Sequence, residues 1–580
     1  MPGQIVTVGV VVALLLPWTV LSVTGFRDGS LSQRIILGIV GGLAATVTLG
    51  YLLAMAGMLH GFHYPYGLAV LAAVASAVGH LRRSRASQGN DSGDKARCPR
   101  PSSNGADAWF VVSILAIAIA YAIPTLSTDA PIGWDPSFHA ILAKKILDTG
   151  ALATDWRPFE EIGVNYPLGM HIFIALASAW SGQQVHQTFQ SLHMVIQIPA
   201  AVLIYLLSLR VFADRKAAAL AMLAYALLCN FGSFISYYQW GGLPTEIAFL
   251  LFLGLIWSCL STEGWKHRSY EVLLFGSLIL VHHLSALIVA AVLAFYVVMK
   301  GVDRSLDDLS KRILWLFGLT FLAYAFFIIP YALRSSQLAG THTLRFTDEP
   351  LIPFWDVVRS LGVAATVLGV LGLVLSLRRA AETSGTFLLC WFTSLVLAFC
   401  LLGYVYRFVA NIFFGEDFTA FTPSRFYTVL SYPLAIYAGY ALAVIATRIQ
   451  GLFHRWMNPR LAEGIALAVL TAAILAAAVP HIHALSGRRA FAPSAPQLAS
   501  HIKAKTPKNA FVIYRQPIGP RAWVPYLTWR PTIYTPIPAS EDRKAIAEKT
   551  EFFSTAHDLD QIRPWLEQRG LQGYLFSREA

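Results

Sequence analysis

Charged residues are scarce in this chain. Asp, Glu, Lys and Arg together make up only 13% of its 580 residues, whereas 56% of the residues are hydrophobic. The mean hydropathy is +0.56. A composition of this kind holds more apolar surface than one water-soluble core can bury. The scarcity of charge therefore excludes an ordinary soluble protein and predicts an integral membrane protein.

Cysteine is also rare and follows no pattern. The five residues are Cys98, Cys229, Cys259, Cys390 and Cys400. They are scattered, four of them lie inside apolar runs, and none forms a CxxC pair. This spacing excludes a disulfide framework, and we expect the cysteines to be packing residues.

Long apolar runs fill most of the sequence. A helix needs about 20 apolar residues to cross roughly 30 Å of hydrocarbon. About fourteen runs approach this length, near 4–24, 35–59, 62–80, 107–126, 189–209, 216–236, 243–260, 270–281, 284–300, 312–334, 354–377, 385–409, 425–447 and 461–483. The first run has neither a preceding charge nor a small-residue cleavage site, so it is expected to be a retained helix. The predicted fold is an all-α polytopic membrane bundle.

The basic residues lie mostly in short loops between these runs, so the net charge of +12 indicates membrane topology and not a nucleic-acid partner. The segment 82–106 carries six basic and two acidic residues and is rich in Ser, Gly and Pro. It is predicted to be a disordered cytoplasmic linker that follows an N-terminal three-helix membrane unit, residues 1–81. If successive spans alternate in direction from this linker and every basic loop is cytoplasmic, the chain requires a helical hairpin broken at His282 and His283. It also requires an interfacial or re-entrant helix at "LGMHIFIALASAWSG".

This topology places a long first loop, 127–167, on the external face of the plasma (inner) membrane, within a transmembrane module spanning 107–485. The loops 236–246, 334–355 and 406–426 lie on the same face. The last segment, 486–580, alternates the β-prone runs "NAFVIYR", "RPTIYTP" and "LQGYLFSRE" with helical patterns. It is predicted to be a small extracytoplasmic α/β domain.

The first external loop gathers charge that the rest of the chain avoids. In "GWDPSFHAILAKKIL", Asp135 precedes Pro136, a strong signal for a helix from Pro136 to about Asp148. His139 lies one turn further along the same face. Asp135 is either a helix cap or a functional acid, and His139 is either a packing or a functional residue.

More polar residues follow in "TDWRPFEEIGVNYPLGMH", which contains Asp155, Arg157, Glu160, Glu161 and His171. Several acids, an arginine and a histidine beside lipid are costly unless they face water. We therefore expect an external aqueous cavity, and such a cavity indicates a site.

These motifs resemble the GT-C-fold polytopic membrane glycosyltransferases. The similar segments are the loop helix "GWDPSFHA", the turn "YPLGMH", the late span "TPSRFYTVLSYPLAIYAGYAL" and the tail sequence "WVPYLTWRPTIYTP". The resemblance covers roughly residues 107–580. It implies transfer of a sugar from a polyprenyl-phosphate donor to an extracytoplasmic acceptor, with a catalytic acid in the first loop. The sequence shows no DxD in that loop and no WWDYG-like segment in the tail, which argues against an oligosaccharyltransferase.

In that chemistry the enzyme supplies a base for the acceptor hydroxyl and positive charge for the departing phosphate. Asp135 is the expected base, with Asp155 as the second candidate. Arg425 is the expected phosphate partner, although an interfacial arginine explains it equally. His139 and Arg157 are expected to line the substrate site.

Glu246, in "WGGLPTE", either orients a sugar hydroxyl or stands at a helix N-terminus. His282 and His283 either contact the phosphate or satisfy a local backbone group. A divalent cation, Mg²⁺ or Mn²⁺, has Asp135, His139 and Glu246 as candidate ligands, although hard-metal sites usually hold more carboxylates.

The main alternative from another class is a multi-pass transporter or flippase for a lipid-linked or amphipathic solute. It shares the broken helix and the intramembrane histidines, but paired repeats and midplane charge are typical of transporters. A third class, a non-catalytic scaffold subunit, would not explain why acidic residues gather in the first loop.

Overall fold

The structure of the chain is a computed structural model. It describes residues 2–25, 30–89, 104–128, 132, 135–160, 163–230, 232–261, 265–341, 353–377, 383–401, 424–486, 488, 495–514, 523–532, 559–568 and 571–576.

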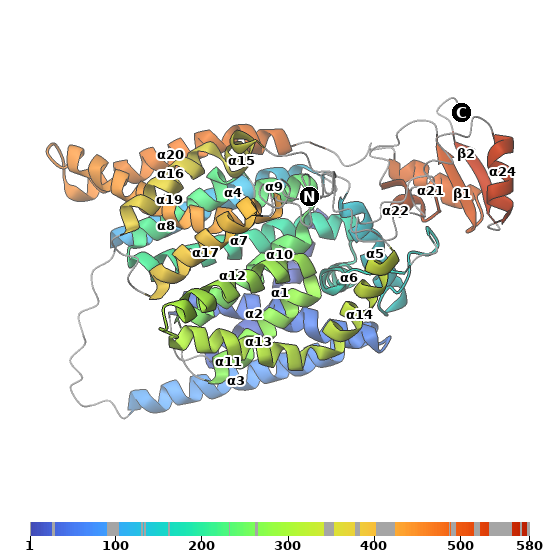
Figure 1. Ribbon diagram of the computed structural model, residues 1–580, viewed down its shortest axis with the longest axis horizontal. Helices are drawn as coiled ribbons and strands as arrows, with labels where there is room; N and C mark the ends of the chain where they lie inside the picture. Colours follow the sequence, from blue (N-terminus) through green and yellow to red (C-terminus); the bar gives the residue numbers. More distant parts are fainter. Residues whose placement is uncertain are drawn as a thin grey trace.

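The described residues include ten helices that are long and apolar enough to cross a membrane. They are α1 (Pro2–Gly25), α2 (Leu31–Met55), α3 (His63–Gly89) with the 3₁₀ turn η1 (Leu59–Phe62), α4 (Asn104–Ser127), α7 (Val185–Phe212), α10 (Leu243–Ser261), α12 (His283–Val302), α17 (Thr383–Cys400), α19 (Ser424–Phe453) and α20 (Pro459–Leu485). The chain is an all-α multi-pass membrane protein, as its composition predicts (Figure 1).

Two bent helix pairs raise the number of candidate spans in the described residues to twelve. The pair α13 (Asp308–Ala323) and α14 (Ala325–Thr341) bends by 77°. The pair α15 (Phe354–Leu361) and α16 (Val363–Ser376) bends by 93° at Gly362, whose φ is +98°. This left-handed backbone suits glycine and ends the first helix of the pair.

Two of the fourteen predicted runs do not form single spans, which corrects the predicted number. Run 216–236 is divided into α8 (Arg215–Leu223), the π-helical turn η2 (Ala224–Leu228) and α9 (Phe234–Trp240). Run 270–281 lies in α11 (Trp265–Val281), which has only 17 residues. The predicted break of the hairpin is confirmed, because α11 ends at Val281 and α12 begins at His283. The helix α6 (Gly169–Ser181) has 13 residues and is shorter than a span.

The N-terminal helix α2 lies in the core of the bundle, although the segment 82–106 separates it from α4 in sequence. The Tyr270 hydroxyl of α11 donates to the Leu37 carbonyl of α2 at 2.7 Å, and Ser277 Oγ donates to the Ala44 carbonyl at 2.9 Å. All four residues are buried. The three-helix unit therefore shares one core with the helices that follow it.

The C-terminal elements stand beside the bundle, at the end near α5 (Asp135–Thr149) (Figure 1). Strand β1 (Ala510–Tyr514) pairs in parallel with β2 (Gln572–Phe576). The helices of this region are α21 (Ala495–Lys505), α22 (Trp523–Thr528) and α24 (Leu559–Gln568). Two of the three predicted β-prone runs form strands. The third, "RPTIYTP", contributes the isolated bridge between Thr532 and Val512, and its residues from 533 onward lie outside the described part of the chain. The limits of a separate domain at 486–580 stay a prediction.

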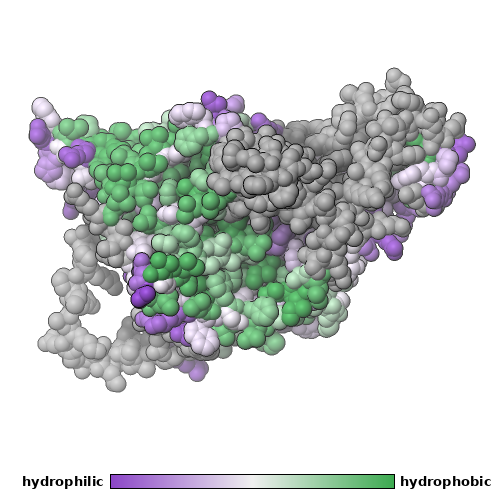
Figure 2. All heavy atoms as spheres, viewed as in Figure 1, coloured by the Kyte–Doolittle hydropathy of each residue, from purple (hydrophilic) through white to green (hydrophobic). Residues whose placement is uncertain are grey.

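The start of α4, which follows the predicted cytoplasmic linker 82–106, meets the starts of α8 and α20 at one end of the bundle. At the start of α4, Trp109 Nε1 donates to Glu463 Oε1 of α20 at 3.1 Å, and Lys216 Nζ of α8 lies 3.0 Å from the same oxygen. The first loop follows the other end of α4, about 27 Å away at 1.5 Å per residue. Figure 2 shows an apolar flank with hydrophilic residues at the tip where α19 turns into α20. Which end faces the cytoplasm stays a prediction.

Candidate functional site

The helix α5 presents the first predicted acid at its start. It begins at Asp135, within one residue of the predicted start, and ends at Thr149. Asp135 is half-buried, and the face that follows it packs into the core. The buried apolar residues of this face are Phe138, Ile141, Leu142 and Ile146. Burial of this face holds the half-buried carboxylate of Asp135 at the edge of the bundle.

A glycine brings the start of another helix to Asp135. Gly241 has φ of +86°, and a Cβ at this position would collide with the ring of Pro136. The backbone of the α9–α10 turn therefore lies directly against the first turn of α5. Glu246 lies in the first turn of α10, and its N–H donates to the Gly242 carbonyl at 3.0 Å. The structure thus places Asp135 and Glu246 on two helix starts that meet.

Glu246 is fully buried beside a histidine. His193 Nδ1 of α7 and Glu246 Oε2 are 2.6 Å apart, and neither side chain is exposed to solvent. One further turn along α7, Gln197 Oε1 accepts a hydrogen bond from the Tyr225 hydroxyl at 2.7 Å. A buried carboxylate requires such partners, because an unpaired charge in this environment is strongly disfavoured.

A second histidine pair lies under α5. His139 Nδ1 and His171 Nε2 are 2.8 Å apart, and both side chains are buried. Burial lowers the pKa of His139 well below its usual value, and the nearby His171 and His282 lower it further. Burial also lowers the pKa of His171, to about 3. Both imidazoles are therefore neutral at pH 7.

Tyr166 joins this pair to the two histidines of the broken hairpin. Its ring centre lies 5.5 Å from that of His139, 5.7 Å from His171, 6.2 Å from His282 and 5.9 Å from His283. His282 also caps α12 by accepting from the Ser285 N–H at 3.3 Å. The local role expected for His282 is thus present, and the predicted residues His139, His282 and His283 belong to one cluster.

Phe189 links the histidine cluster to the Glu246 pair. Its ring stacks on His139 with centres 6.2 Å apart and lies 5.6 Å from His193. An aromatic and imidazole wall thus runs from Tyr166 to Glu246 beneath the start of α5.

Sequence reasoning missed the polar stripe of α7 that supplies much of this wall. His186, Gln190, His193 and Gln197 are all buried and recur at intervals of three or four residues. This spacing places them on one helical face. The same period could have revealed the stripe, but the high average hydropathy of α7 concealed it.

Asp155 lies apart from Asp135. Its Oδ1 is 2.8 Å from Lys145 Nζ and accepts the Arg157 N–H at 3.0 Å. Partial burial opposes ionisation, but the hydrogen bond and charge of Lys145 outweigh it, so the pKa of Asp155 lies below its usual value. Lys145 is ten residues beyond Asp135, about 15 Å along the helix. The exposed Arg157 also lies at this distant end.

Two of the expected charged residues lie outside the described part of the molecule. Arg425 falls in the first turn of α19, but its side chain is not among those described, and neither is Glu161.

The three candidate metal ligands do not fit a common metal site. His139 is engaged with His171, and Glu246 with His193. Within the residues that the structure describes, no three His, Cys, Asp or Glu side chains gather closely enough to hold a metal ion.

The C-terminal segment contacts the start of α7 and the far end of the first loop through α22 and the residue Trp529, which belong to the predicted tail sequence "WVPYLTW". The Tyr526 hydroxyl lies 3.1 Å from His186 Nδ1 at the start of α7. Trp529 lies edge-on to Phe159 of the first loop with ring centres 5.2 Å apart, and Lys144 Nζ of α5 lies 5.0 Å from the Trp529 ring. These contacts fix the C-terminal segment against the first loop.

Comparison with solved structures shows that the chain has the GT-C fold of polytopic membrane glycosyltransferases. An oligosaccharyltransferase from Archaeoglobus fulgidus, solved with a tethered acceptor peptide, matches at a TM-score of 0.53 and 14% identity. The match covers 79% of this chain and 68% of that one. ArnT from Cupriavidus metallidurans, solved with undecaprenyl phosphate, matches at 0.51 and 14% identity, covering 73% and 85%. No protein-family model and no curated protein sequence matches the chain.

Proposed function

We propose that the chain is a membrane glycosyltransferase that transfers a sugar from a polyprenyl-phosphate donor to an extracytoplasmic acceptor. The observation that carries this proposal is the GT-C fold, which the chain shares with two glycosyltransferases over 73% and 79% of its length. One of these neighbours was solved with undecaprenyl phosphate and the other with an acceptor peptide. Donor and acceptor of these chemical classes are therefore the first to test.

Asp135 is the proposed general base. It takes the proton of the acceptor hydroxyl while the acceptor oxygen attacks the anomeric carbon of the sugar. The bond from that carbon to the phosphate oxygen breaks, and polyprenyl phosphate leaves with the electron pair. A single displacement of this kind inverts the anomeric carbon. Asp135 fits the role because it is half-buried at the start of a helix that the core holds in place.

The two helix starts that meet at Gly241 favour negative charge. The first turns of α5 and α10 both direct backbone N–H groups and the positive ends of their dipoles toward this region. A departing phosphate at this point would be stabilised by both helices, and by Arg425 if its guanidinium reaches the same region. Glu246 is engaged by His193, and Asp135, at the start of α5, is the acid proposed to take up the proton.

The neutral histidines suit a site for an uncharged sugar ring. A neutral imidazole both donates and accepts hydrogen bonds, so His139 can pair with a sugar hydroxyl without adding charge. Tyr166 offers an aromatic surface in the middle of the cluster. No step of this mechanism passes through a metal ion, because the candidate ligands do not converge.

The decisive experiment gives the purified chain, in proteoliposomes, a polyprenyl phosphate bearing a radiolabelled sugar, together with an envelope extract as acceptor. Transfer releases free polyprenyl phosphate and moves the label to a new product. A flippase would instead move the intact lipid-linked sugar to the other leaflet. Translocation without cleavage would reject the transferase in favour of that alternative.

A further inference from the structure

The tail meets the first loop at Trp529, whose backbone is strained. Its φ is +53°, in the left-handed region that residues other than glycine rarely adopt. Phe159 of the loop and Lys144 of α5 both lie against its ring. Strained residues held in this way gather at ligand sites. Trp529 is the centre of a tail junction that also includes Lys144, Lys503 and Arg530.

Arg530 brings a buried positive charge to the tail junction. Its side chain is only 7% exposed. Nη1 donates to the Trp529 carbonyl at 3.2 Å, and Nη2 donates to the carbonyls of Thr506 at 3.0 Å and Lys503 at 3.5 Å. Nε donates to the Thr506 hydroxyl at 3.3 Å. All of these acceptors are neutral, so they fix the guanidinium without cancelling its charge.

Two lysines add to this charge. Lys144 Nζ pairs with Asp148 at 2.7 Å, while the exposed Lys503 makes no ion pair within the described part of the chain. Partial burial lowers the pKa of Lys503, and the positive charges of Lys144 and Arg530 lower it further, whereas Asp148 raises it. The single acid is therefore shared among three cations. The tail junction carries an excess of positive charge that an anion would stabilise.

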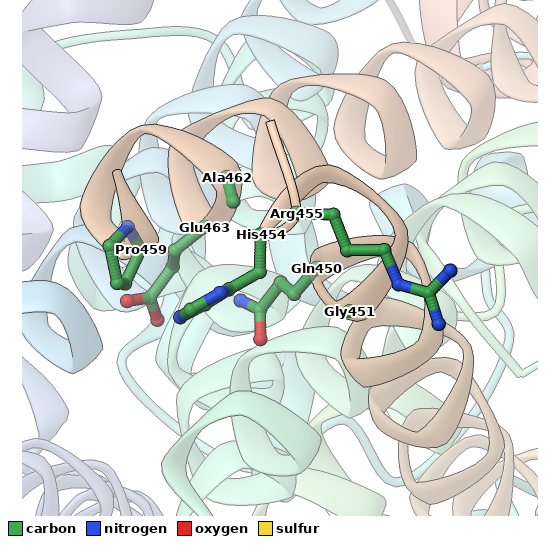
Figure 3. Close-up of a pocket in the computed structure, with 7 residues that line it drawn as sticks. All are labelled: Gln450, Gly451, His454, Arg455, Pro459, Ala462 and Glu463. Atoms are coloured by element: carbon green, nitrogen blue, oxygen red, sulfur yellow. The ribbon is translucent and has the colours of Figure 1, made fainter. Parts of the chain in front are cut away.

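The cavity of about 440 Å³ between the end of α19 and the start of α20 offers no such excess (Figure 3). Figure 3 shows Arg455 directed away from the other lining residues. The acid of that lining, Glu463, pairs with Lys216 at 3.0 Å. The cations of the tail junction are thus the stronger candidate for binding an anion.

The surface around the tail junction is polar. In the described parts of the first loop and of the tail, no large hydrophobic side chain is exposed. Segments that lie on a membrane combine basic residues with an exposed apolar face. The tail junction has the charge without that face, so it suits a water-soluble anion better than a lipid surface.

We propose that the tail junction binds an anionic group, a carboxylate or a phosphate, of a glycan acceptor. This inference rests on the proposed function, whose acceptor it describes. Lys144 lies nine residues beyond Asp135, about 14 Å along α5. The anionic group therefore belongs to a part of the acceptor that is separated from the reacting hydroxyl. The tail selects an acidic glycan over a neutral one.

The test measures ligand binding by the full-length protein in phosphatidylcholine nanodiscs at low ionic strength, where exposed charges are least screened. Hexagalacturonate supplies carboxylates, a glycerol-phosphate hexamer supplies phosphates, and maltohexaose is the neutral probe. The variant carries Lys144→Gln and Lys503→Gln. The matched control, Lys505→Gln with Lys508→Gln, removes two exposed cations of the same tail. Lys505 lies on the opposite side of α21 from Lys503.

Wild-type protein and the control should bind at least one anionic probe about fivefold or more tightly than maltohexaose, and the junction variant should lose that preference. The tighter of the two anionic probes identifies the group. Equal binding of all three probes by the wild type, or an equal loss in both double variants, would overturn the proposal.

Chemical labelling of lysine amines in the wild type gives an answer even if the junction variant does not fold. The bound anionic probe should protect Lys144 and Lys503, but not Lys508, from an amine-reactive reagent. Protection of Lys503 by phosphatidylglycerol nanodiscs, without protection by either anionic probe, would assign the tail junction to the membrane surface instead.

The probe that binds should also compete with the envelope extract in the transfer assay. Binding without competition would overturn the assignment to the acceptor. Absence of transfer in that assay, with anion binding intact, would count against the proposed function. The two failures are therefore distinguishable.

Discussion

The replacement of Asp135 by Asn distinguishes a catalytic role of this residue from a role in starting helix α5. Asparagine keeps the size of the side chain and its preference for the first turn of a helix but removes the negative charge. Asp135 is half-buried and lies in the first turn of α5, where a carboxylate gains about 0.3–1 kcal/mol from the helix dipole. The expected loss of unfolding free energy is therefore at most about 1 kcal/mol. Transfer should nevertheless fall at least about 100-fold, the usual scale for losing a general base.

Asp155→Asn is the matched control within the same loop. It breaks the 2.8 Å ion pair with Lys145, in which the Asp155 side chain is 40% exposed. Exposed pairs contribute about 0.2–1 kcal/mol, so the two variants should lose similar stability. Asp155 pairs with Lys145, which is about 15 Å along α5 from Asp135, so its variant should keep transfer within a few-fold of wild type.

The assay compares initial rates of label transfer with thermal unfolding followed by size-exclusion chromatography. Both variants are first shown to insert and elute like the wild type. A dead Asp155→Asn with an active Asp135→Asn would exchange the roles of the two acids. Full activity of both variants would refute the reasoning, because Asp135 would then be only the start of a helix.

Three further predictions concern other parts of the molecule. Deleting residues 491–580 should abolish or redirect transfer while the helices remain inserted, and unchanged activity and acceptor range would remove the tail from the mechanism. The single variant Trp529→Ala removes the contacts to Phe159 and Lys144, so it should expose the tail to limited proteolysis. The folded-state pKa of His139 is lowered, so its contribution to stability is fully present above about pH 6.5. That contribution is lost as the pH falls below this value, by up to about 1.4 kcal/mol per pH unit. His139→Asn should therefore flatten the pH dependence of the melting temperature, and an identical slope would contradict the assignment. Finally, a Ser92→Cys variant should resist an impermeant thiol reagent in intact cells, since segment 82–106 is predicted to be cytoplasmic; ready labelling would reverse the orientation of the proposed site.

Hydropathy predicted most of the helices because span length and apolar composition are local properties. The Asp-Pro pair, another local signal, predicted the start of α5 within one residue. The alternation of basic loops located the hairpin break at His282. Hydropathy did not predict the division of run 216–236, because a window average is insensitive to the π-helical turn at Ala224–Leu228.

The site itself depends on contacts between residues far apart in sequence. The pairing of His193 with Glu246 joins residues 53 positions apart, and that of His139 with His171 joins residues 32 apart. No motif indicated either pair. Asp155 was grouped with Asp135 because both belong to one loop, but the intervening helix holds them at opposite ends of α5. Loop membership is a weak guide to proximity when the loop contains a rigid helix.

The hydrogen bonds from α11 to α2 also constrain the order in which the chain assembles during synthesis. Ser277 and its acceptor Ala44 are 233 residues apart. At about 5–20 residues per second, roughly 10–50 s pass between the emergence of α2 and that of its partner. The surface of α2 around Gly41 later packs closely against the Tyr270 ring. During the interval before α11 emerges, this surface must contact lipid or a factor that binds it. Membrane insertion and bundle assembly are therefore separate events in time for this chain, and substitutions in α2 should act on the yield of folded protein before they act on its activity.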